Sequence, residues 1–489
     1  MAFGHNTVTH NTFTGVTMNK RTFASSWRLL ALPLVGGMMV QSAHAVPSFA
    51  RQTGMACEAC HTIFPELTPF GRQFKINGYT ITGMQQIEAK STDSSPGLKL
   101  NAIPPLSFMF QTSVSRIANT DKSTGAPIAQ QYTVQFPQQA SIFFAGEITQ
   151  HIGSFLQMTY SHQTDHFTQD QSEIRYANQT MVMSMPVAYG LTVNNTPTME
   201  DPWQGTFDWH FPDMNPGAAL PVPNAAPLMS RLGQSVAGIG AYTHINNHWY
   251  LDVTGYRSEQ AGKGQPYNAT VTNYLDGISP YWRAAFDTDL PGSAGYLEVG
   301  AYGMMAKAYP TGISNLPTGG ADHYIDNAVD MQYELPLGND MLIVRGQYVM
   351  EKDKLNASYA AGNASNLFDS MNYAELNVGY HFGSKQEAVL GYQRTTGTPD
   401  AKAYQNSILG GSAGVAYGNP NATSNASLNN NPASTAFILE YDYLPAENVK
   451  LGVQYTAYTQ FDGGSTNYDG QNRNASQNNT AMLSGWFMW

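Results

Sequence analysis

The chain has 489 residues and a net charge of −11, and only 12% of its residues are charged, against about 25% in ordinary soluble domains. The negative charge argues against nucleic acid as a partner. Beyond residue 45 no segment approaches the ~20 apolar residues of a membrane helix, which argues against a helical anchor there. Sparse charge with 28 Tyr and 45 Gly favours an all-β chain, either a membrane β-barrel or a secreted protein.

Residues 1–45 have the pattern of a secretory signal peptide. Basic residues precede an apolar run at 29–40, and Ala43-His44-Ala45 fits the small-x-small cleavage rule. We therefore expect the mature chain to begin at Val46, and Met18 is the more ordinary start for such a signal. The alternative, an uncleaved anchor helix, is disfavoured because the apolar run is too short to span a bilayer.

The strongest motif in the chain is Cys57-Glu58-Ala59-Cys60-His61. Cys-x-x-Cys-His is the attachment signature of a c-type haem, in which two thiols bond the porphyrin and the histidine becomes the proximal iron ligand. The alternatives are a disulfide, a thioredoxin-like redox pair or half of a zinc site. No other cysteine exists, no further ligands are spaced for zinc, and no βαβ pattern surrounds the motif. We predict one covalent haem on Cys57 and Cys60, with His61 as axial ligand.

Residues 46–103 form a small mixed segment around this motif. Pro65, Pro69, Gly71 and Gly78 divide it into short elements. The segment is too short to build a good core alone, although a covalent haem would add apolar surface. We expect it to pack as a cytochrome plug against a larger structure.

Residues 104–489 alternate apolar and polar side chains with period two, the pattern of strands with one apolar face. In 374–382, for example, apolar residues at even positions alternate with Glu375, Asn377 and His381. The candidate strands have the ~9–11-residue length of tilted membrane strands. They begin near residues 104, 133, 152, 172, 187, 234, 248, 281, 294, 323, 341, 372, 386, 434, 448 and 479.

The connections between these strands alternate between long, such as 196–233 and 397–433, and short, such as 245–247. Outer-membrane barrels segregate their loops in this way, whereas a soluble sandwich has no reason to. We predict an antiparallel transmembrane barrel of about sixteen strands in the bacterial outer membrane, with the haem plug in its polar lumen and both mature termini on the periplasmic side. Trp489 ends the chain on the apolar parity, which resembles a barrel-assembly signal. The Asn- and Gly-rich loops carry few charges, so we also hypothesise an acidic exterior.

The stretch Pro47–His61 and the run Phe64–Lys75, closing at Gly78-Tyr79, resemble the haem segment of the outer-membrane cytochrome–porin fusions of iron-oxidising bacteria. Beyond these residues the likeness is architectural, a monohaem plug in front of a porin. The resemblance implies ferrous iron as electron donor, ferrous-iron oxidase activity, and a periplasmic cytochrome or copper protein as acceptor. The sparse charge makes the acidophilic members the closer comparison.

The distal iron ligand is left open by the sequence. A methionine would raise the reduction potential, as a donor as weak as ferrous iron requires. Met84 is the first methionine after residue 61, although plug packing explains it equally well. His381 is the alternative because its parity points into the lumen near a short turn, whereas His162 has the outward parity. The iron could also lack a sixth protein ligand.

The lumen-facing positions include carboxylates that would attract a cation. For any single residue, however, we favour the alternative of pairing with plug or luminal cations such as Arg345 and Lys450. These carboxylates are Glu298, Asp330, Glu334, Glu375 and Glu440. Two other functions remain open at this point. One is a conduit for another donor, such as a sulfur compound or a solid electrode, and the other is a transport porin whose plug senses or gates.

Overall fold

The computed structural model describes residues 46–81, 86–89, 98–118, 131–161, 166–216, 223, 225–259, 274–310, 320–404, 427–470 and 472–489. By its contacts the chain divides after Gln41, and every described residue belongs to the second unit, Ser42–Trp489. Across these ranges no helix combines the length and apolarity needed to cross a membrane.

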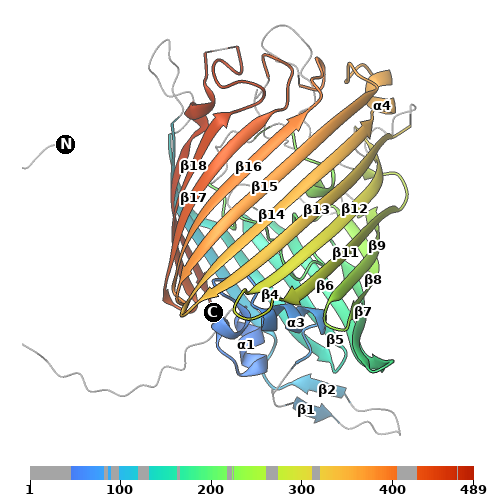
Figure 1. Cartoon of the computed structure of the whole chain (residues 1–489), viewed down its shortest axis with the longest axis vertical. Coiled ribbons are helices and arrows are strands. Elements are labelled where there is room, and N and C mark those ends of the chain that lie inside the picture. The colour runs from blue at the N-terminus through green and yellow to red at the C-terminus, as the bar shows by residue number, and fades with distance from the viewer. Residues whose placement is uncertain are drawn as a thin grey trace, which may run out of the picture. The chain divides into compact units, whose positions relative to one another are not determined.

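Sixteen antiparallel strands of the described chain close into a barrel (Figure 1). Each strand pairs with its neighbours in chain order, and the ring closes where β19 pairs with β3. The two-residue strand β10 (Tyr274–Leu275) pairs with the end of β12, while β9 pairs with β11 across it. The prediction of an even-numbered barrel of about sixteen strands is confirmed.

The barrel strands have the following bounds. They are β3 (Leu106–Ile117), β4 (Tyr132–Thr149), β5 (Ile152–Ser161), β6 (His166–Val182), β7 (Met185–Asn194), β8 (Val236–Ile245), β9 (Trp249–Ser258), β11 (Ser279–Asp289), β12 (Tyr296–Tyr309), β13 (Asp322–Leu337), β14 (Asp340–Lys354), β15 (Phe368–Phe382), β16 (Gln386–Gly397), β17 (Ser434–Ala446), β18 (Val449–Gln460) and β19 (Thr480–Met488). The predicted starts differ most at β6 and β15, which begin several residues earlier than the alternation suggested.

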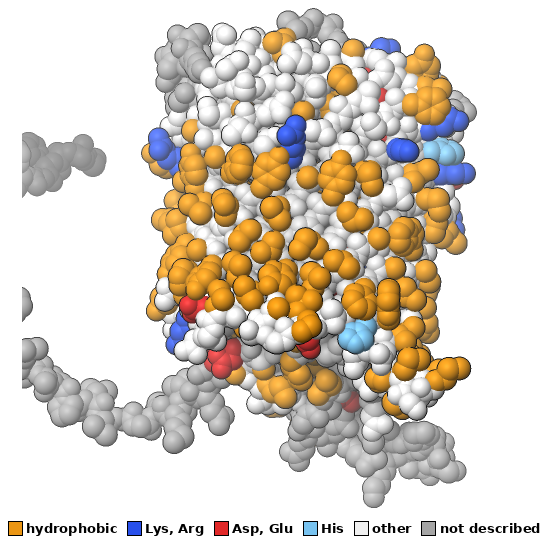
Figure 2. Space-filling view, viewed as in Figure 1, with side chains coloured by type: hydrophobic (Ala, Val, Ile, Leu, Met, Phe, Trp, Pro, Cys, Tyr) orange, Lys and Arg blue, Asp and Glu red, His pale blue; other side chains and the backbone are white. Residues whose placement is uncertain are grey.

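The barrel wall is apolar on the outside and polar on the inside. Along β9, Trp249 and Val253 are exposed by 54% and 61%, while Asp252 and Thr254 are buried. Figure 2 shows hydrophobic side chains spread in a broad band over the visible wall. Period-two alternation produces this arrangement directly, because successive side chains of a strand point to opposite faces.

Connections at the two ends of the barrel differ in length, as predicted. At one end the turns are tight, and in the turn between β8 and β9 both Asn246 and Asn247 have positive φ, as in the type I′ turns that favour Asn in hairpins. Most of the long connections lie at the other end, and β3 begins and β19 ends at the tight-turn end (Figure 1). A short helix, α4 (Asn356–Ala360), and the 3-10 turn η3 (Ala475–Asn478) lie in the long connections.

The N-terminal segment, residues 46–81, lies at the tight-turn end of the barrel (Figure 1). It contains α1 (Pro47–Thr53), α2 (Cys57–Cys60) and α3 (Pro69–Ile76). Thr68 caps α3 by accepting a hydrogen bond from the Gly71 N–H. A two-stranded hairpin, β1 (Gln86–Ala89) and β2 (Leu98–Asn101), follows before β3.

The connection between β7 and β8, here called the inserted segment (residues 195–235), corrects the expectation of an exterior loop. Its side chains bond to opposite parts of the inner wall: Trp203 Nε1 donates to Tyr296 on β12, and Gln454 on β18 donates to the Met214 carbonyl. The segment therefore crosses the lumen. Its Trp and Phe residues, including Trp203 and Phe207, bury apolar surface that an exterior loop would leave in water.

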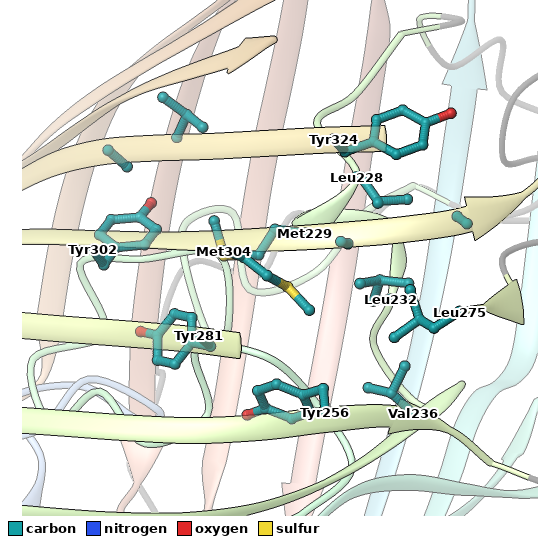
Figure 3. Close-up of a cluster of buried hydrophobic side chains, with 14 of the residues drawn as sticks. Leu228, Met229, Leu232, Val236, Tyr256, Leu275, Tyr281, Tyr302, Met304 and Tyr324 are labelled. Atoms are coloured by element: carbon teal, nitrogen blue, oxygen red, sulfur yellow. The ribbon is translucent and has the colours of Figure 1, made fainter. Parts of the chain in front are cut away.

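The far part of the inserted segment is held by a buried apolar cluster that includes a 3-10 turn, η1 (Met229–Arg231). Figure 3 shows Met229 beside Met304, and Leu228 beside Tyr324, of the barrel strands. This cluster fixes the segment to β9, β11, β12 and β13, so the apolar core of this molecule lies partly inside the barrel.

Candidate functional site

The two cysteines occupy the first and last positions of α2, a single helical turn. Residues three apart lie on the same side of such a turn, so both thiols are presented to one surface. Burial raises the pKa of the Cys60 thiol to about 11. The Cys57 N–H donates to Glu447 Oε2 at 3.0 Å, which ties the turn to the connection between β17 and β18.

The His61 ring is oriented by two backbone carbonyls. Its Nδ1 lies 3.1 Å from the Pro65 oxygen and 3.1 Å from the Glu66 oxygen. Carbonyls only accept hydrogen bonds, so the proton of the neutral ring sits on Nδ1 and the lone pair on Nε2. Burial lowers the pKa of His61 to about 4, against the raising effect of these two hydrogen bonds. The ring therefore stays neutral in moderately acidic solution, with Nε2 available to a metal.

A cavity of about 340 Å³ lies beside this motif, and Cys57, Cys60 and His61 all line it. Its volume falls in the range of ligand sites, roughly 300–1,000 Å³. The other walls are rich in aromatic side chains from three parts of the chain: the N-terminal segment, the inner barrel wall and the inserted segment. These aromatic side chains include Phe49, Phe64, Phe74, Phe143, Phe155, Phe207, Trp209 and Trp486. The walls suit a flat apolar ligand.

The inserted segment forms one wall of the cavity. Lys75 on α3 donates to the Met199 and Asp201 carbonyls at 2.6 and 3.0 Å. Gln204 accepts from the Leu67 N–H and donates to the Pro65 carbonyl, at 2.9 and 3.1 Å. Because Pro65 also accepts from His61, these contacts connect the inserted segment to the residues that orient the histidine.

The two predicted distal ligands lie elsewhere or cannot be placed. Met84 lies outside the described residues, as does His162. His381 does face inward, as its parity predicted, and is 2% exposed. It is not among the described residues that line the cavity, and its Nε2 lies 3.3 Å from both Glu66 and Glu387. The geometry therefore gives His381 carboxylate neighbours in place of a position over His61.

Other side chains able to bind iron do line the cavity, and sequence reasoning missed them. They are Met55, Met109, Met199, Met488 and His210. Parity could have identified Met109 and Met488, because both occupy inward positions of barrel strands. No pattern in the sequence points to Met199 or His210, because both belong to the inserted segment.

Buried ion pairs join the N-terminal segment to the barrel wall. Arg72 on α3 lies 2.5 Å from Glu334 on β13, and both side chains are almost fully buried. Glu66 pairs with Arg345 on β14. Burial alone would raise the pKa of Glu66, but Arg345 together with His381 lowers it below its ordinary value. These pairs fix the segment in one position, because a buried charge without its partner is costly.

The five predicted luminal carboxylates do face inward and are buried. Glu298 and Asp330 both bond Arg283 of β11, at 3.0 and 2.8 Å. Glu440 accepts from Gln454 at 2.7 Å, and Glu375 accepts from Gln347 at 3.1 Å. Pairing with plug or luminal cations, the predicted alternative, therefore describes Glu298, Asp330 and Glu334 better than a free cation-attracting surface. Their partners are the luminal Arg283 and the Arg72 of the N-terminal segment.

Two carboxylates of the inserted segment lie near the site. Burial raises the pKa of Asp208 to about 8 and that of Asp213 to about 6, although Lys75 and Lys450 respectively oppose these shifts. Asp213 lines the cavity and lies 3.2 Å from Lys450 Nζ. Both groups therefore take up protons above the pH at which a solvated aspartate would.

Comparisons with known proteins concern the barrel. No family model and no curated protein matches the chain. OprB of Pseudomonas putida is 12% identical with a TM-score of 0.45, covering 78% of this chain and 93% of its own. OmpF of Salmonella typhi, in complex with daunomycin, is 11% identical with a TM-score of 0.44, and the match covers 78% of this chain and 97% of OmpF. Because these identities and TM-scores are low, the barrel architecture rests on this chain's own strand pairing.

Proposed function

We propose that this chain is an outer-membrane monohaem cytochrome–porin. It takes electrons from extracellular ferrous iron and passes them to a periplasmic cytochrome or copper protein. The observation that carries the proposal is the Cys57-x-x-Cys60-His61 turn. Both of its thiols and its histidine border one aromatic cavity. The iron donor comes from the resemblance of residues 47–79 to the haem segment of iron-oxidising bacteria.

The residues around the cavity fit a c-type haem. Cys57 and Cys60 would hold it through thioether bonds, and Nε2 of His61 would be its axial ligand. When bound there, the haem supplies one-electron redox chemistry. The chain's own residues orient and enclose that group: the Pro65 and Glu66 carbonyls fix the histidine ring. Lys75 holds the inserted segment across the cavity and limits the entry of water.

The membrane setting is supported by the apolar exterior. Exposed hydrophobic residues recur around the ring, for example Ile239 on β8 at 72% and Leu439 on β17 at 59%. A soluble protein rarely leaves so much contiguous apolar surface in water, whereas an outer-membrane barrel requires it. In this proposal the tight-turn end, which carries the N-terminal segment, faces the periplasm and the carrier.

Stopped-flow visible spectroscopy tests the function. The oxidised, detergent-solubilised protein is mixed with ferrous iron at pH 2–3 and again near neutral pH. Rapid growth of the reduced haem band is expected, and its pH dependence tests the acidic-exterior hypothesis. A haem that dithionite reduces but ferrous iron does not would overturn the iron donor.

The cofactor itself is checked in the same preparation. A pyridine haemochrome spectrum should report one thioether-linked haem per chain. The double variant Cys57→Ser/Cys60→Ser should retain the barrel, measured by its heat-dependent migration in gels, and lose covalent haem. A wild-type protein without covalent haem after expression with c-type maturation factors would contradict the proposal at its base.

A second candidate is a transport porin whose N-terminal segment only senses or gates. The polar inner wall of the barrel favours it, because such walls line aqueous channels. The contacts of Lys75 and Arg72 with the wall and the inserted segment predict a low conductance. Conductance in planar bilayers decides: a large open channel together with an iron-inert haem would favour the porin.

A further inference from the structure

Three ligand-bearing side chains from distant parts of the chain meet beside the N-terminal segment. Glu66 follows the motif by five residues, and His381 and Glu387 are directly opposed partners on β15 and β16. One ligand atom from each of the three lies within 4.8 Å of the others. One imidazole and two carboxylates form a donor set that first-row divalent metals accept.

The polar atoms of this cluster lack the bonds that buried groups normally make. His381 Nε2 lies 3.3 Å from Glu66 Oε2 and 3.3 Å from Glu387 Oε1. Within the described chain, however, His381 Nδ1, His381 Nε2 and Glu387 Oε1 have no hydrogen-bond partner. His381 and Glu387 are 2% and 4% exposed. Buried polar groups left in this state call for an explanation, and an absent ion is one.

The cluster also has space and a way in. A Cβ added to Gly379, which shares the inward face of β15, would lie 2.5 Å from Glu387 Oε1 and 3.7 Å from His381 Nε2. A glycine here therefore keeps the space in front of both groups free. The Glu66 side chain is 15% exposed, the most accessible of the three, which makes it the side from which an ion would enter.

The charges around the cluster favour a cation. Glu66 is paired with Arg345, whereas Glu387 forms no such pair with an arginine or lysine in the described chain. The nearby Lys450 is already shared between Asp213 and Asp442, at 3.2 Å from each. With these four carboxylates ionised and His381 neutral, they outnumber Arg345 and Lys450 by two negative charges. A divalent ion would balance it.

We propose that Glu66, His381 and Glu387 bind a first-row divalent metal ion. Resting on the proposed function, we assign this ion as the ferrous substrate. The backbone carbonyl of Glu66 accepts the hydrogen bond from His61 Nδ1 at 3.1 Å. An ion on the Glu66 carboxylate would thus be held by a residue that hydrogen-bonds directly to the histidine that would hold the haem. A ferrous ion held there would give up one electron to the oxidised haem and become ferric, and no proton or other atom would be transferred.

The test uses the full-length, haem-loaded protein in detergent, with Mn²⁺ as the probe. Binding removes the sharp solution EPR signal of free Mn²⁺, and one site per chain is expected. Glu387→Gln and His381→Phe should weaken it at least about tenfold, since the loss even of a supporting contact costs 10–100-fold in affinity. Gly379→Ala keeps all three ligands but fills the space, and it should also weaken binding.

Asp369→Asn is the matched control, because this buried residue lies on the same inward face of β15 and accepts from Asn366 at 2.8 Å. It should bind Mn²⁺ like the wild type. The haem spectrum and the heat-dependent gel migration verify that every variant is folded. Absence of Mn²⁺ binding in a folded wild type, or binding unchanged in all three site variants, overturns the site.

Ferrous reduction of the haem then separates this inference from the proposed function. Slower reduction in the three site variants, with the control unchanged, supports the substrate assignment. Mn²⁺ binding at these residues with unchanged reduction rates overturns that assignment and leaves a structural ion. If the wild-type protein binds Mn²⁺ at these residues but ferrous iron never reduces its haem, the proposed function is overturned and the metal site stands.

Discussion

At the scale of single residues, the motif turn depends on close packing that only glycine allows. A Cβ on Gly71 of α3 would lie 2.2 Å from the Cys60 carbonyl oxygen and 3.1 Å from the Leu67 side chain. The first neighbour is backbone and cannot rotate away. Gly71 therefore sets how closely α3 approaches the turn that carries both thiols and His61.

We predict that Gly71→Ala separates α3 from the motif turn and reduces covalent haem incorporation several-fold. The overpacking cost in such a site is about 1–3 kcal/mol or more. Haem-stained gels normalised to total protein measure the effect. Gly233→Ala is the control, because its Cβ would meet only the Thr196 side chain at an ordinary 3.4 Å. Equal haem content in both variants would contradict the role of Gly71.

At the scale of elements, the N-terminal segment is held to the wall by contacts on opposite sides. Arg72 reaches Glu334 on β13, while Gly78 contacts β5, where a Cβ on Gly153 would lie 2.1 Å from the Gly78 oxygen. Tyr79 also donates to Glu173 on β6 at 2.8 Å. The N-terminal segment therefore contacts both sides of the barrel wall, β13 on one side and β5 and β6 on the other.

We predict that Gly153→Ala loosens the N-terminal segment without opening the barrel. The added Cβ collides with backbone, so the segment must move by a larger amount than a side chain rotation would require. Faster amide hydrogen exchange is expected in residues 69–79, with the strands of β13 to β18 unchanged. Gly255→Ala, whose Cβ would meet only Ile278 at 3.2 Å, should exchange like the wild type. Unchanged exchange in Gly153→Ala would argue against this contact.

At the scale of the whole molecule, the described unit is a barrel whose interior is packed by its own chain. The inserted segment and the N-terminal segment meet inside it, and the cavity lies between them. Acidic groups buried in this interior, rather than those on the surface, then determine how stability changes with pH. Asp208 and Asp213 are the clearest of these groups outside the strands.

We predict that the lumen packing becomes less stable as pH rises from about 4 to 8. The pKa values of Asp208 and Asp213 are raised from 3.8 to about 8 and about 6, so the folded state binds more protons than the unfolded state throughout that window. Glu66 and His61 have lowered pKa values and act in the opposite sense. The contribution of Glu66 is lost only below its ordinary value of 4.5, and His61, with its pKa lowered from 6.5 to about 4, offsets one of the two aspartates between those pH values. A midpoint of thermal unfolding, followed by tryptophan fluorescence, should fall with pH.

Asp208→Asn provides the check on that prediction. Asp208 has the higher pKa of the two aspartates. Without it, the midpoint of thermal unfolding should change less with pH above about pH 6, the pKa of Asp213. An unfolding midpoint that rises with pH, or a variant with the same slope as the wild type, would contradict the role of Asp208.

The sequence alone determined the barrel and the motif, because both are encoded locally. Period-two alternation places Asp252 inside and Val253 outside without reference to any distant residue, and the lengths of the connections indicate which end is which. The spacing of Cys57, Cys60 and His61 likewise fits within one turn. These features need only the geometry of a strand or of a helical turn.

Only the tertiary structure decided what surrounds the motif. The inserted segment turns inward through contacts such as Trp203 with Tyr296, and His381 meets Glu66 although the two are far apart in the chain. Side-chain parity indicates a face of the wall, but it does not give the height along the barrel or the partner across the lumen. Those depend on strand register and on how two separate segments pack together, which no local pattern contains.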